Sequence, residues 1–144
     1  MTIEMAWTAD AVDETVRPED DAAITACLLD YFEGWFDGDA VRMDRALHQG
    51  LAKHAIGQDS ARSDTLDVTT KAEMVDATRR GRGRLRDVPD RAIRIEVASV
   101  SGDIASAVVH SAVYVEYALL ARTADGWRIT STLWRWADGQ GPRA

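Results

Sequence analysis

A single acidic side chain lies within a long apolar stretch near the C-terminus. Glu116 is the only acid between Ile104 and Arg122, and its sequence neighbours are aliphatic or aromatic. Because apolar surroundings disfavour a charged carboxyl, they raise its pKa toward the range of a general acid or base. A buried Glu116 would therefore be suited to acid–base chemistry. The alternative is a solvated carboxylate, or one paired with Arg94 or Arg135.

A histidine precedes Glu116 in the same stretch, within the segment SAVVHSAVY. Alternate side chains of a strand point to the same face, so His110 shares a face with Val108 and Ala112. A histidine on one face of a central strand is a candidate for the wall of a pocket. We take His110, with Glu116, as the first two candidates for catalytic groups.

Aromatic residues supply candidates for a ligand-binding wall. Tyr31 and Trp35 are four residues apart and so lie on one face of a predicted helix. They either stack on a ligand or simply form the core face of an amphipathic helix. Further aromatic candidates for the pocket are Tyr114, Tyr117 and Trp134.

The three histidines, His48, His54 and His110, show no spacing typical of metal ligands. Folding could still gather them, but the expectation is that there is no metal site. We also find no phosphate loop, dinucleotide fingerprint or nucleophile elbow, and we expect no cofactor.

These side chains must be positioned by a chain of 144 residues, which fits one domain. The net charge of −7 is concentrated in residues 1–21, which hold seven acids and one base, whereas the remaining 123 residues hold 17 acids and 16 bases. The absence of a basic stripe argues against nucleic-acid binding.

The single cysteine excludes an intrachain disulfide framework, and Cys27 is expected to be a buried, inert thiol. No run approaches 18 apolar residues, and the N-terminus lacks a basic segment followed by an apolar one. We therefore expect no membrane span, no secretory signal and a cytoplasmic location.

The apolar periodicity predicts helices first and strands afterwards, an α+β order. Pro18 and the acids after it begin a helix over about 19–37, and Asp39 caps a short second helix with Met43, Ala46 and Leu47 buried. A short strand over 51–57 and a polar loop follow. Thr70 and Glu73 form a capping box for a third helix over about 70–80. The strands are predicted over about 91–100, 103–113, 114–123 and 127–136.

The arginine-rich segment 79–91 separates the helices from these strands. It is either a site for an anion or an acidic partner, including the chain's own acidic arm, or a solvated loop.

Strict alternation along the last strand places Trp127, Ile129, Ser131 and Leu133 on one face and Trp134 and Trp136 on the other. Both faces then carry apolar or aromatic groups. Since an exposed sheet face is normally polar, this pattern predicts a homodimer formed through the sheet face opposite the helices.

Five segments in this order resemble the nuclear-transport-factor-2-like superfamily, and more narrowly its lumazine-binding branch: YFEGWFDGD, ALHQGLAK, TKAEMVDATR, VEY and DGWRITSTLW. The resemblance implies a cone-shaped, cystatin-like α+β fold, as in polyketide cyclases. The sheet would be a curved antiparallel one of about four long strands plus a short one, with three N-terminal helices on its concave face.

The resemblance also implies one domain over 19–137, between an acidic N-terminal arm (1–18) and a disordered C-terminal tail (138–144). It implies an apolar pocket between helices and sheet, and adds His48 and Lys53 as pocket candidates, although His48 is equally suited to a structural hydrogen bond. The superfamily contains isomerases, dehydratases, hydrolases, cyclases and binding proteins, so the fold alone does not select a reaction.

We therefore expect a homodimeric protein that binds a small, apolar or cyclic organic molecule. The alternative is a cofactor-independent acid–base enzyme (isomerase, lyase or hydrolase) that acts on such a molecule through Glu116 and His110. A third interpretation is an interaction module whose tryptophan-rich face binds another protein.

Overall fold

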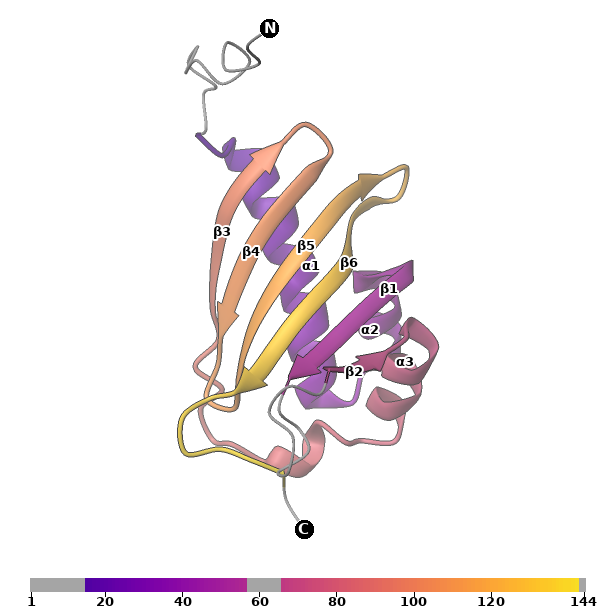
Figure 1. Cartoon of the computed structure of the whole chain (residues 1–144), viewed down its shortest axis with the longest axis vertical. Coiled ribbons are helices and arrows are strands. Elements are labelled where there is room, and N and C mark those ends of the chain that lie inside the picture. Colours follow the sequence, from indigo (N-terminus) through magenta and orange to yellow (C-terminus); the bar gives the residue numbers. More distant parts are fainter. Residues whose placement is uncertain (1–14, 57–65, 143–144) are drawn as a thin grey trace, which may run out of the picture.

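The computed structural model describes residues 15–56 and 66–142, and within them it forms one curved, unclosed sheet with helices on one face (Figure 1). The elements are α1 (Pro18–Asp37), α2 (Ala40–Ala46), β1 (Leu47–Ile56), β2 (Leu66–Thr69), α3 (Lys71–Arg79), the 3-10 turn η2 (Arg84–Arg86), β3 (Arg94–Ser101), β4 (Ile104–His110), β5 (Tyr114–Thr123) and β6 (Gly126–Trp136). The strands are ordered β2-β1-β6-β5-β4-β3. The predicted α+β class, with three helices before the meander, is confirmed.

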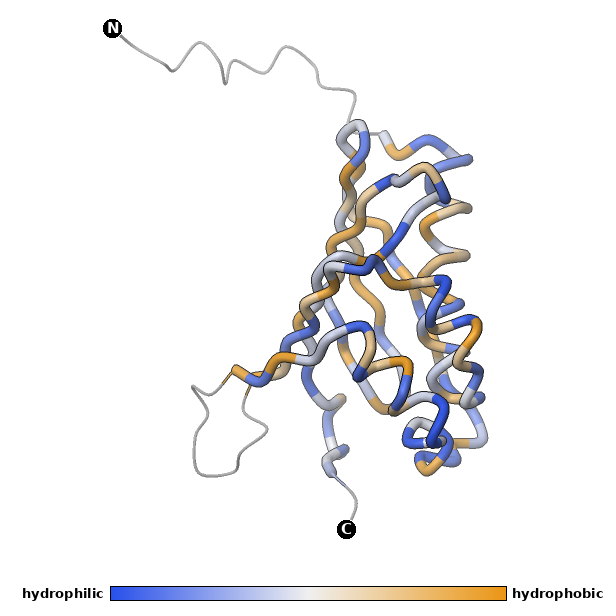
Figure 2. The backbone as a smooth tube through the Cα atoms, turned by 90° about the vertical axis from the view of Figure 1, so that its right-hand side faces the viewer, coloured by the Kyte–Doolittle hydropathy of each residue, from blue (hydrophilic) through white to orange (hydrophobic). Residues whose placement is uncertain are grey.

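The helices and the sheet form two layers that are separate in profile, with hydrophobic residues in both (Figure 2). The longest helix, α1, crosses one face of the sheet, while α2 and α3 lie beside its lower half, next to β1 and β2 (Figure 1). Burial of apolar residues between the layers is the main stabilising contribution to such a fold.

Helix α1 begins and ends where the sequence predicts. Pro18 occupies the first turn, where a missing backbone N–H costs nothing, and three acids follow it at the positive end of the helix dipole. Gly38 ends the helix in the left-handed conformation, with φ of 72°. Its backbone N–H then donates to the last carbonyls of the helix, a geometry that glycine adopts without steric cost.

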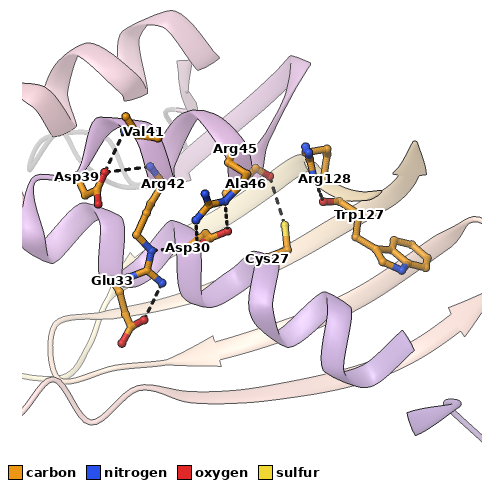
Figure 3. Close-up of polar contacts among 10 residues, drawn as sticks. All are labelled: Cys27, Asp30, Glu33, Asp39, Val41, Arg42, Arg45, Ala46, Trp127 and Arg128. Atoms are coloured by element: carbon orange, nitrogen blue, oxygen red, sulfur yellow. Dashed lines mark hydrogen bonds and ion pairs between the residues drawn. The ribbon is translucent and has the colours of Figure 1, made fainter. Parts of the chain in front are cut away.

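Hydrogen bonds that involve charged side chains cap helix α2 and hold it against α1 (Figure 3). The Asp39 carboxylate caps α2 by accepting from the backbone N–H groups of Val41 and Arg42, each at 3.1 Å. On α1, Asp30 accepts from the side chains of Arg42 and Arg45, each at 2.9 Å. The hydrogen bond from Arg45 is the largest cause of a lowered pKa of Asp30. These contacts fix the orientation of the short helix.

Cys27 is buried in the same region, where its Sγ donates to the carbonyl of Ala46 at 3.4 Å (Figure 3). Burial raises the pKa of the thiol to about 12, although the charge of Arg128 opposes this shift. The prediction of a buried thiol is confirmed, and the raised pKa leaves almost none of the reactive thiolate at neutral pH.

Two boundaries at the N-terminal side of the sheet differ from prediction. Leu47 is buried as expected, but it begins β1 instead of ending α2, so β1 is longer than the predicted strand over 51–57. The segment assigned to a loop contains β2, which pairs antiparallel with β1. Its side chains are mostly exposed, so no apolar alternation marked it as a strand.

The sheet is mixed, because β1 runs parallel to β6 while the other neighbouring pairs are antiparallel. The register pairs Lys53 of β1 with Thr132 of β6, and Ala55 with Trp134. A purely antiparallel sheet was expected. The parallel pair joins strands about 80 residues apart, a long-range contact that local patterns do not encode.

A β-bulge at Thr130 changes which side chains of β6 face the helices. Leu119 and Leu120 of β5 pair with Ser131 and Ile129, so Thr130 has no partner of its own. The extra residue reverses the alternation predicted for the second half of the strand. Along its whole length the strand turns one row of side chains inward: Trp127, Ile129, Thr132, Trp134 and Trp136. The prediction that the tryptophans divide between two faces is therefore wrong.

Charges in the arginine-rich segment are largely satisfied by the domain itself. Arg80 forms an ion pair with Asp76 at 3.0 Å, and Arg91 forms one with Asp37 at 2.5 Å. Arg86 is buried. Two of these arginines thus pair with carboxylates of α3 and of the end of α1, and a third is buried, so the segment is not the fully solvated loop of the second interpretation; the anion site stays a prediction. The acidic residues 1–14 lie outside the described residues.

The chain after β6 contacts the domain at Ala137 and Gly141. The backbone N–H of Ala137 donates to the carbonyl of Val113 at 2.8 Å. The guanidinium of Arg86 donates to the carbonyl of Gly141 at 2.7 Å and lies 4.2 Å from the ring centre of Trp136. Residues 143–144 lie outside the described residues.

Candidate functional site

A cavity of about 350 Å³ lies between α1, α3 and the helix-facing side of the sheet. This volume is within the range of small-molecule sites. Five of the residues that line it form an aromatic wall: Phe32, Trp35, Tyr114, Trp134 and Trp136. Its polar groups are Tyr31, Lys53 and Glu116, with Asp67 and Thr69 of β2 on the same wall.

Three elements bring one cluster of polar side chains together in this cavity. The hydroxyl of Tyr31, on α1, donates to Oε2 of Glu116, on β5, at 2.7 Å. Nζ of Lys53, on β1, donates to the Tyr31 hydroxyl and lies 3.5 Å from the same carboxylate oxygen. A tyrosine hydroxyl has a single hydrogen, so it accepts from Lys53 and donates to Glu116. The cluster is thus an ordered chain from amine to hydroxyl to carboxylate.

Burial governs the electrostatics of the cluster. It raises the pKa of Tyr31 well above the ordinary range, and the nearby Glu116 carboxylate raises it further. Burial also lowers the pKa of Lys53, although the carboxylate opposes this shift. Only 12% of the Lys53 side chain and 4% of the Glu116 side chain are exposed to solvent. Tyr31 therefore remains a proton donor at neutral pH, beside an amine that gives up its proton more readily than usual.

The aromatic wall is held in place by contacts among its own rings. Nε1 of Trp35 donates to the hydroxyl of Tyr114 at 3.0 Å. The ring centres of Tyr114 and Trp134 lie 5.4 Å apart, and those of Trp134 and Trp136 lie 5.0 Å apart, both pairs edge to face. Burial raises the pKa of Tyr114. Such a packed wall offers flat surfaces to a ligand without first having to order its side chains.

Six of the predicted site residues lie at the cavity: Tyr31, Trp35, Lys53, Tyr114, Glu116 and Trp134. Tyr31 also packs into the hydrophobic core, with 2% exposure, so the core interpretation of this helical face is confirmed, and stacking on a ligand stays a prediction. Glu116 is buried at 3% exposure, which removes the solvated alternative. Its ion-pair partner is Lys53, instead of the arginines considered from the sequence.

The structure does not bring His110 to Glu116. Val109 pairs with Glu116 across the strands and is fully buried on the helix-facing side, so the next residue, His110, lies on the opposite face. The expectation that His110 lines the pocket is therefore not met.

Two other candidates also lie away from the cavity. Tyr117 follows Glu116 directly in the strand, so it faces outward, with 63% exposure. His48 lies at the start of β1, where its Nδ1 accepts from the backbone N–H of Gly50 at 2.9 Å. That contact is the structural role considered for His48 from the sequence.

Several cavity residues were not among the candidates. Trp136 is two residues beyond Trp134, so strand alternation alone could have found it. Phe32 of α1 and Met74 of α3 are buried apolar residues of their helices, and helical periodicity alone does not distinguish such core positions from a cavity wall. Asp67 and Thr69 had no signal, because β2 itself was not predicted.

Within residues 15–56 and 66–142, no three His, Cys, Asp or Glu side chains converge as metal ligands. His54, for example, places Nδ1 3.2 Å from the carbonyl oxygen of Thr132. In the same part of the chain, no helix is long and apolar enough to cross a membrane.

Solved structures with the same fold come from several bacteria. An NTF2-like protein of unknown function from Silicibacter pomeroyi superposes with a TM-score of 0.64 at 17% identity, covering 85% of this chain and 100% of its own. An NTF2-like protein with a cystatin-like fold from Novosphingobium aromaticivorans gives 0.62 at 20% identity, with coverages of 85% and 84%. A ketosteroid isomerase-like protein from Erwinia carotovora atroseptica gives 0.59 at 20% identity, with coverages of 85% and 99%. At these identities the likeness establishes the fold.

The sequence has no match among curated proteins. A family model described as "Putative lumazine-binding" matches residues 19–135, which hold all of the helices and strands except Pro18 and Trp136, and every cavity-lining residue except Trp136. The chain therefore belongs to this family of NTF2-like, cystatin-like α+β proteins.

Proposed function

We propose that the protein binds a small, planar ring compound in the cavity between α1, α3 and the sheet. The observation that carries this proposal is the combination of an aromatic wall with a single buried polar cluster, Lys53–Tyr31–Glu116. Flat rings stack on tryptophan and tyrosine faces, while a few placed polar groups fix the orientation of a ligand.

The polar cluster favours a ligand with adjacent hydrogen-bond acceptors and donors on one edge. Lys53 supplies donors and Glu116 supplies an acceptor, within 3.5 Å of one another. Lumazine, the compound in the family's description, is a fused two-ring heterocycle with carbonyl and ring N–H groups. Its shape and edge chemistry match such a site, so it is the first ligand to test.

We also propose that the protein is a homodimer formed through the convex face of the sheet. One row of residues follows the register across five neighbouring strands of that face: Val108, Tyr117, Leu133, His54 and Val68. Three members of the row are 45–63% exposed. Four of the five side chains in this row are apolar or aromatic, and such a row on an uncovered sheet face supports burial against a second copy.

A second candidate function is acid–base catalysis at Glu116. This carboxylate is buried in the cavity and accepts a hydrogen bond from Tyr31, which stays protonated. A base next to a proton donor is the arrangement needed to move a proton on a bound ring compound. Turnover of a ligand that disappears in Glu116→Gln, while binding persists, would select this function over binding alone.

The binding proposal is tested by titrating lumazine and following tryptophan fluorescence, since three tryptophans line the cavity. Tyr31→Phe removes one hydroxyl from the site, and Tyr117→Phe removes an exposed hydroxyl from the other face of the sheet. We expect Tyr31→Phe to weaken binding about fivefold, the value of a hydrogen bond of about 1 kcal/mol. Tyr117→Phe should bind as the wild type does. Equal affinities in all three proteins would argue against binding in this cavity.

A further inference from the structure

We propose that Lys53 captures an aldehyde or ketone in the cavity as a Schiff base, a step that rests on the cavity being the binding site proposed above. The inference goes beyond reversible binding, because it assigns a covalent role to one side chain and a chemical class, a reactive carbonyl, to its ligand. This inference rests on the position of the Lys53 amine in the cavity.

The amine of Lys53 is enclosed by groups suited to imine chemistry. Nζ contacts the Tyr31 hydroxyl, lies 3.5 Å from the Glu116 carboxylate and lies 5.3 Å from the ring centre of Trp134. A ligand stacked on that ring therefore places its edge beside the amine. Bond formation is much faster when two reacting groups are held close together in a fixed orientation.

The surroundings also favour the reactive form of the amine. Only the neutral amine attacks a carbonyl, and burial lowers the pKa of Lys53 while Glu116 opposes this shift. A desolvated lysine in an apolar pocket is the usual form of a Schiff-base nucleophile. The amine therefore has the position that the step requires, and the direction of its pKa shift makes the neutral form easier to reach.

The proposed step balances without an oxidant or reductant. The nitrogen lone pair forms a bond to the carbonyl carbon, and the C=O π electrons move to oxygen, which takes a proton from Tyr31. Glu116 accepts a proton from nitrogen and returns it to Tyr31 along their 2.7 Å hydrogen bond. Tyr31 then donates a second proton, to the hydroxyl of this adduct; the nitrogen lone pair forms the C=N bond, the C–O bond breaks and oxygen leaves as water. Glu116 takes the remaining N–H proton of the protonated imine and returns it to Tyr31, so that carbonyl and amine have become imine and water. The Glu116 carboxylate lies where it stabilises the protonated imine.

The chain contains an internal control, because its sequence has only one other lysine. Nζ of Lys71 donates to the carbonyl of Leu47 at 2.9 Å and lies 3.5 Å from Asp44, a carboxylate that is largely exposed. Lys71 does not line the cavity. Its side chain is 12% exposed, as is that of Lys53, so its rate of modification in the same sample reports the reactivity of an equally buried lysine outside the cavity.

The experiment incubates the wild-type protein with 2-naphthaldehyde and sodium cyanoborohydride at pH 7, and quantifies adducts at each lysine by peptide mass spectrometry. Cyanoborohydride reduces an imine to a stable secondary amine, so each adduct records a Schiff base. Because the cavity holds the carbonyl beside the amine, we expect Lys53 to be labelled more than about tenfold faster than Lys71. Glu116→Gln should slow labelling at Lys53 and leave Lys71 unchanged.

A parallel titration with 2-naphthalenemethanol, which has the same rings but no carbonyl, separates the two proposals. Binding of this alcohol without preferential labelling of Lys53 by the aldehyde would overturn the Schiff-base inference and leave the proposed binding function intact. Failure of both the alcohol to bind and the aldehyde to label Lys53 would overturn both. Preferential labelling that the alcohol suppresses would support both.

Discussion

The hydroxyl of Tyr31 and the carboxylate of Glu116 are 85 residues apart in sequence and 2.7 Å apart in the fold. This hydrogen bond links the long helix to the centre of the sheet, inside the cavity. Lys53 completes the cluster from a third element. The same three side chains thus join the two layers of the fold and supply the polar end of the proposed ligand site.

The first prediction concerns the buried pair of Lys53 and Glu116. Replacing Glu116 with Leu leaves the ammonium of Lys53 without its carboxylate, and we expect the free energy of unfolding to fall by about 3 kcal/mol. The double variant Lys53→Met, Glu116→Leu should regain most of this loss, because no unpaired charge remains.

Urea unfolding of the wild type, both single variants and the double variant measures this coupling. Glu96→Leu serves as the control, since Glu96 is exposed on an edge strand and should change stability by less than about 0.5 kcal/mol. Additive single effects would show that the two side chains do not act as a pair.

The sequence predicts the element order and six of the thirteen residues that line the cavity, and the reasons differ from residue to residue. Glu116 stands out because a lone acid in an apolar strand needs a partner. Tyr117, by contrast, is among the pocket candidates from the sequence although adjacent strand residues face opposite sides, so it cannot face the cavity together with Glu116. Lys53 was reached only through the family resemblance, because its partners come from distant segments.

Other features could not be predicted from local patterns. The bulge at Thr130 depends on how β6 pairs with β5, and it reverses the facing of the residues after it. Strand β2 has exposed side chains and forms only because β1 provides an edge for it. Both are consequences of long-range pairing, which period-2 and period-3.6 patterns do not contain.

The second prediction concerns the close approach of Gly83 to α1. A Cβ added at Gly83 would lie 2.1 Å from the carbonyl oxygen of Trp35, a backbone atom that cannot rotate away. We expect Gly83→Ala to destabilise the protein by about 1–3 kcal/mol and to displace Trp35 from the cavity wall. Thermal unfolding and lumazine affinity should therefore both change. Gly141→Ala, where an added Cβ meets nothing within 4 Å, should match the wild type in both measurements.

The third prediction concerns alkaline pH. Burial raises the pKa of Cys27 from 9.0 to about 12, so the unfolded chain releases the thiol proton at lower pH than the folded chain does. The unfolded state then binds fewer protons, and the stability associated with Cys27 falls as the pH rises between these two values. Between pH 9 and 10 the loss should be about 1 kcal/mol.

Chemical denaturation of the wild type and Cys27→Ala at pH 8, 9 and 10 isolates this effect. The variant is expected to be less stable at pH 8, where its cavity is the main difference, and to lose less stability than the wild type by pH 10. Parallel pH profiles for the two proteins would be inconsistent with a thiol that stays protonated in the fold.

The fourth prediction concerns the convex face. Leu133→Asp places a charge within the exposed apolar row, and we expect it to convert the proposed dimer to the 15.8 kDa monomer in sedimentation velocity at micromolar concentration. Leu85→Asp is the matched control, because Leu85 is 70% exposed on η2, away from the sheet face. A wild type that already sediments as a monomer would refute this assembly.

The most direct test of the proposed binding site is the response of the tryptophan indole N–H signals to lumazine in ¹H–¹⁵N NMR. Trp35, Trp134 and Trp136 line the cavity, whereas Trp127 is buried at 5% exposure elsewhere on β6 and provides the control within the same spectrum. With signals assigned by single Trp→Phe variants, we expect the three cavity resonances to shift in a saturable manner while that of Trp127 stays in place. Saturable binding that leaves the three cavity signals unmoved would contradict a ligand site in this cavity.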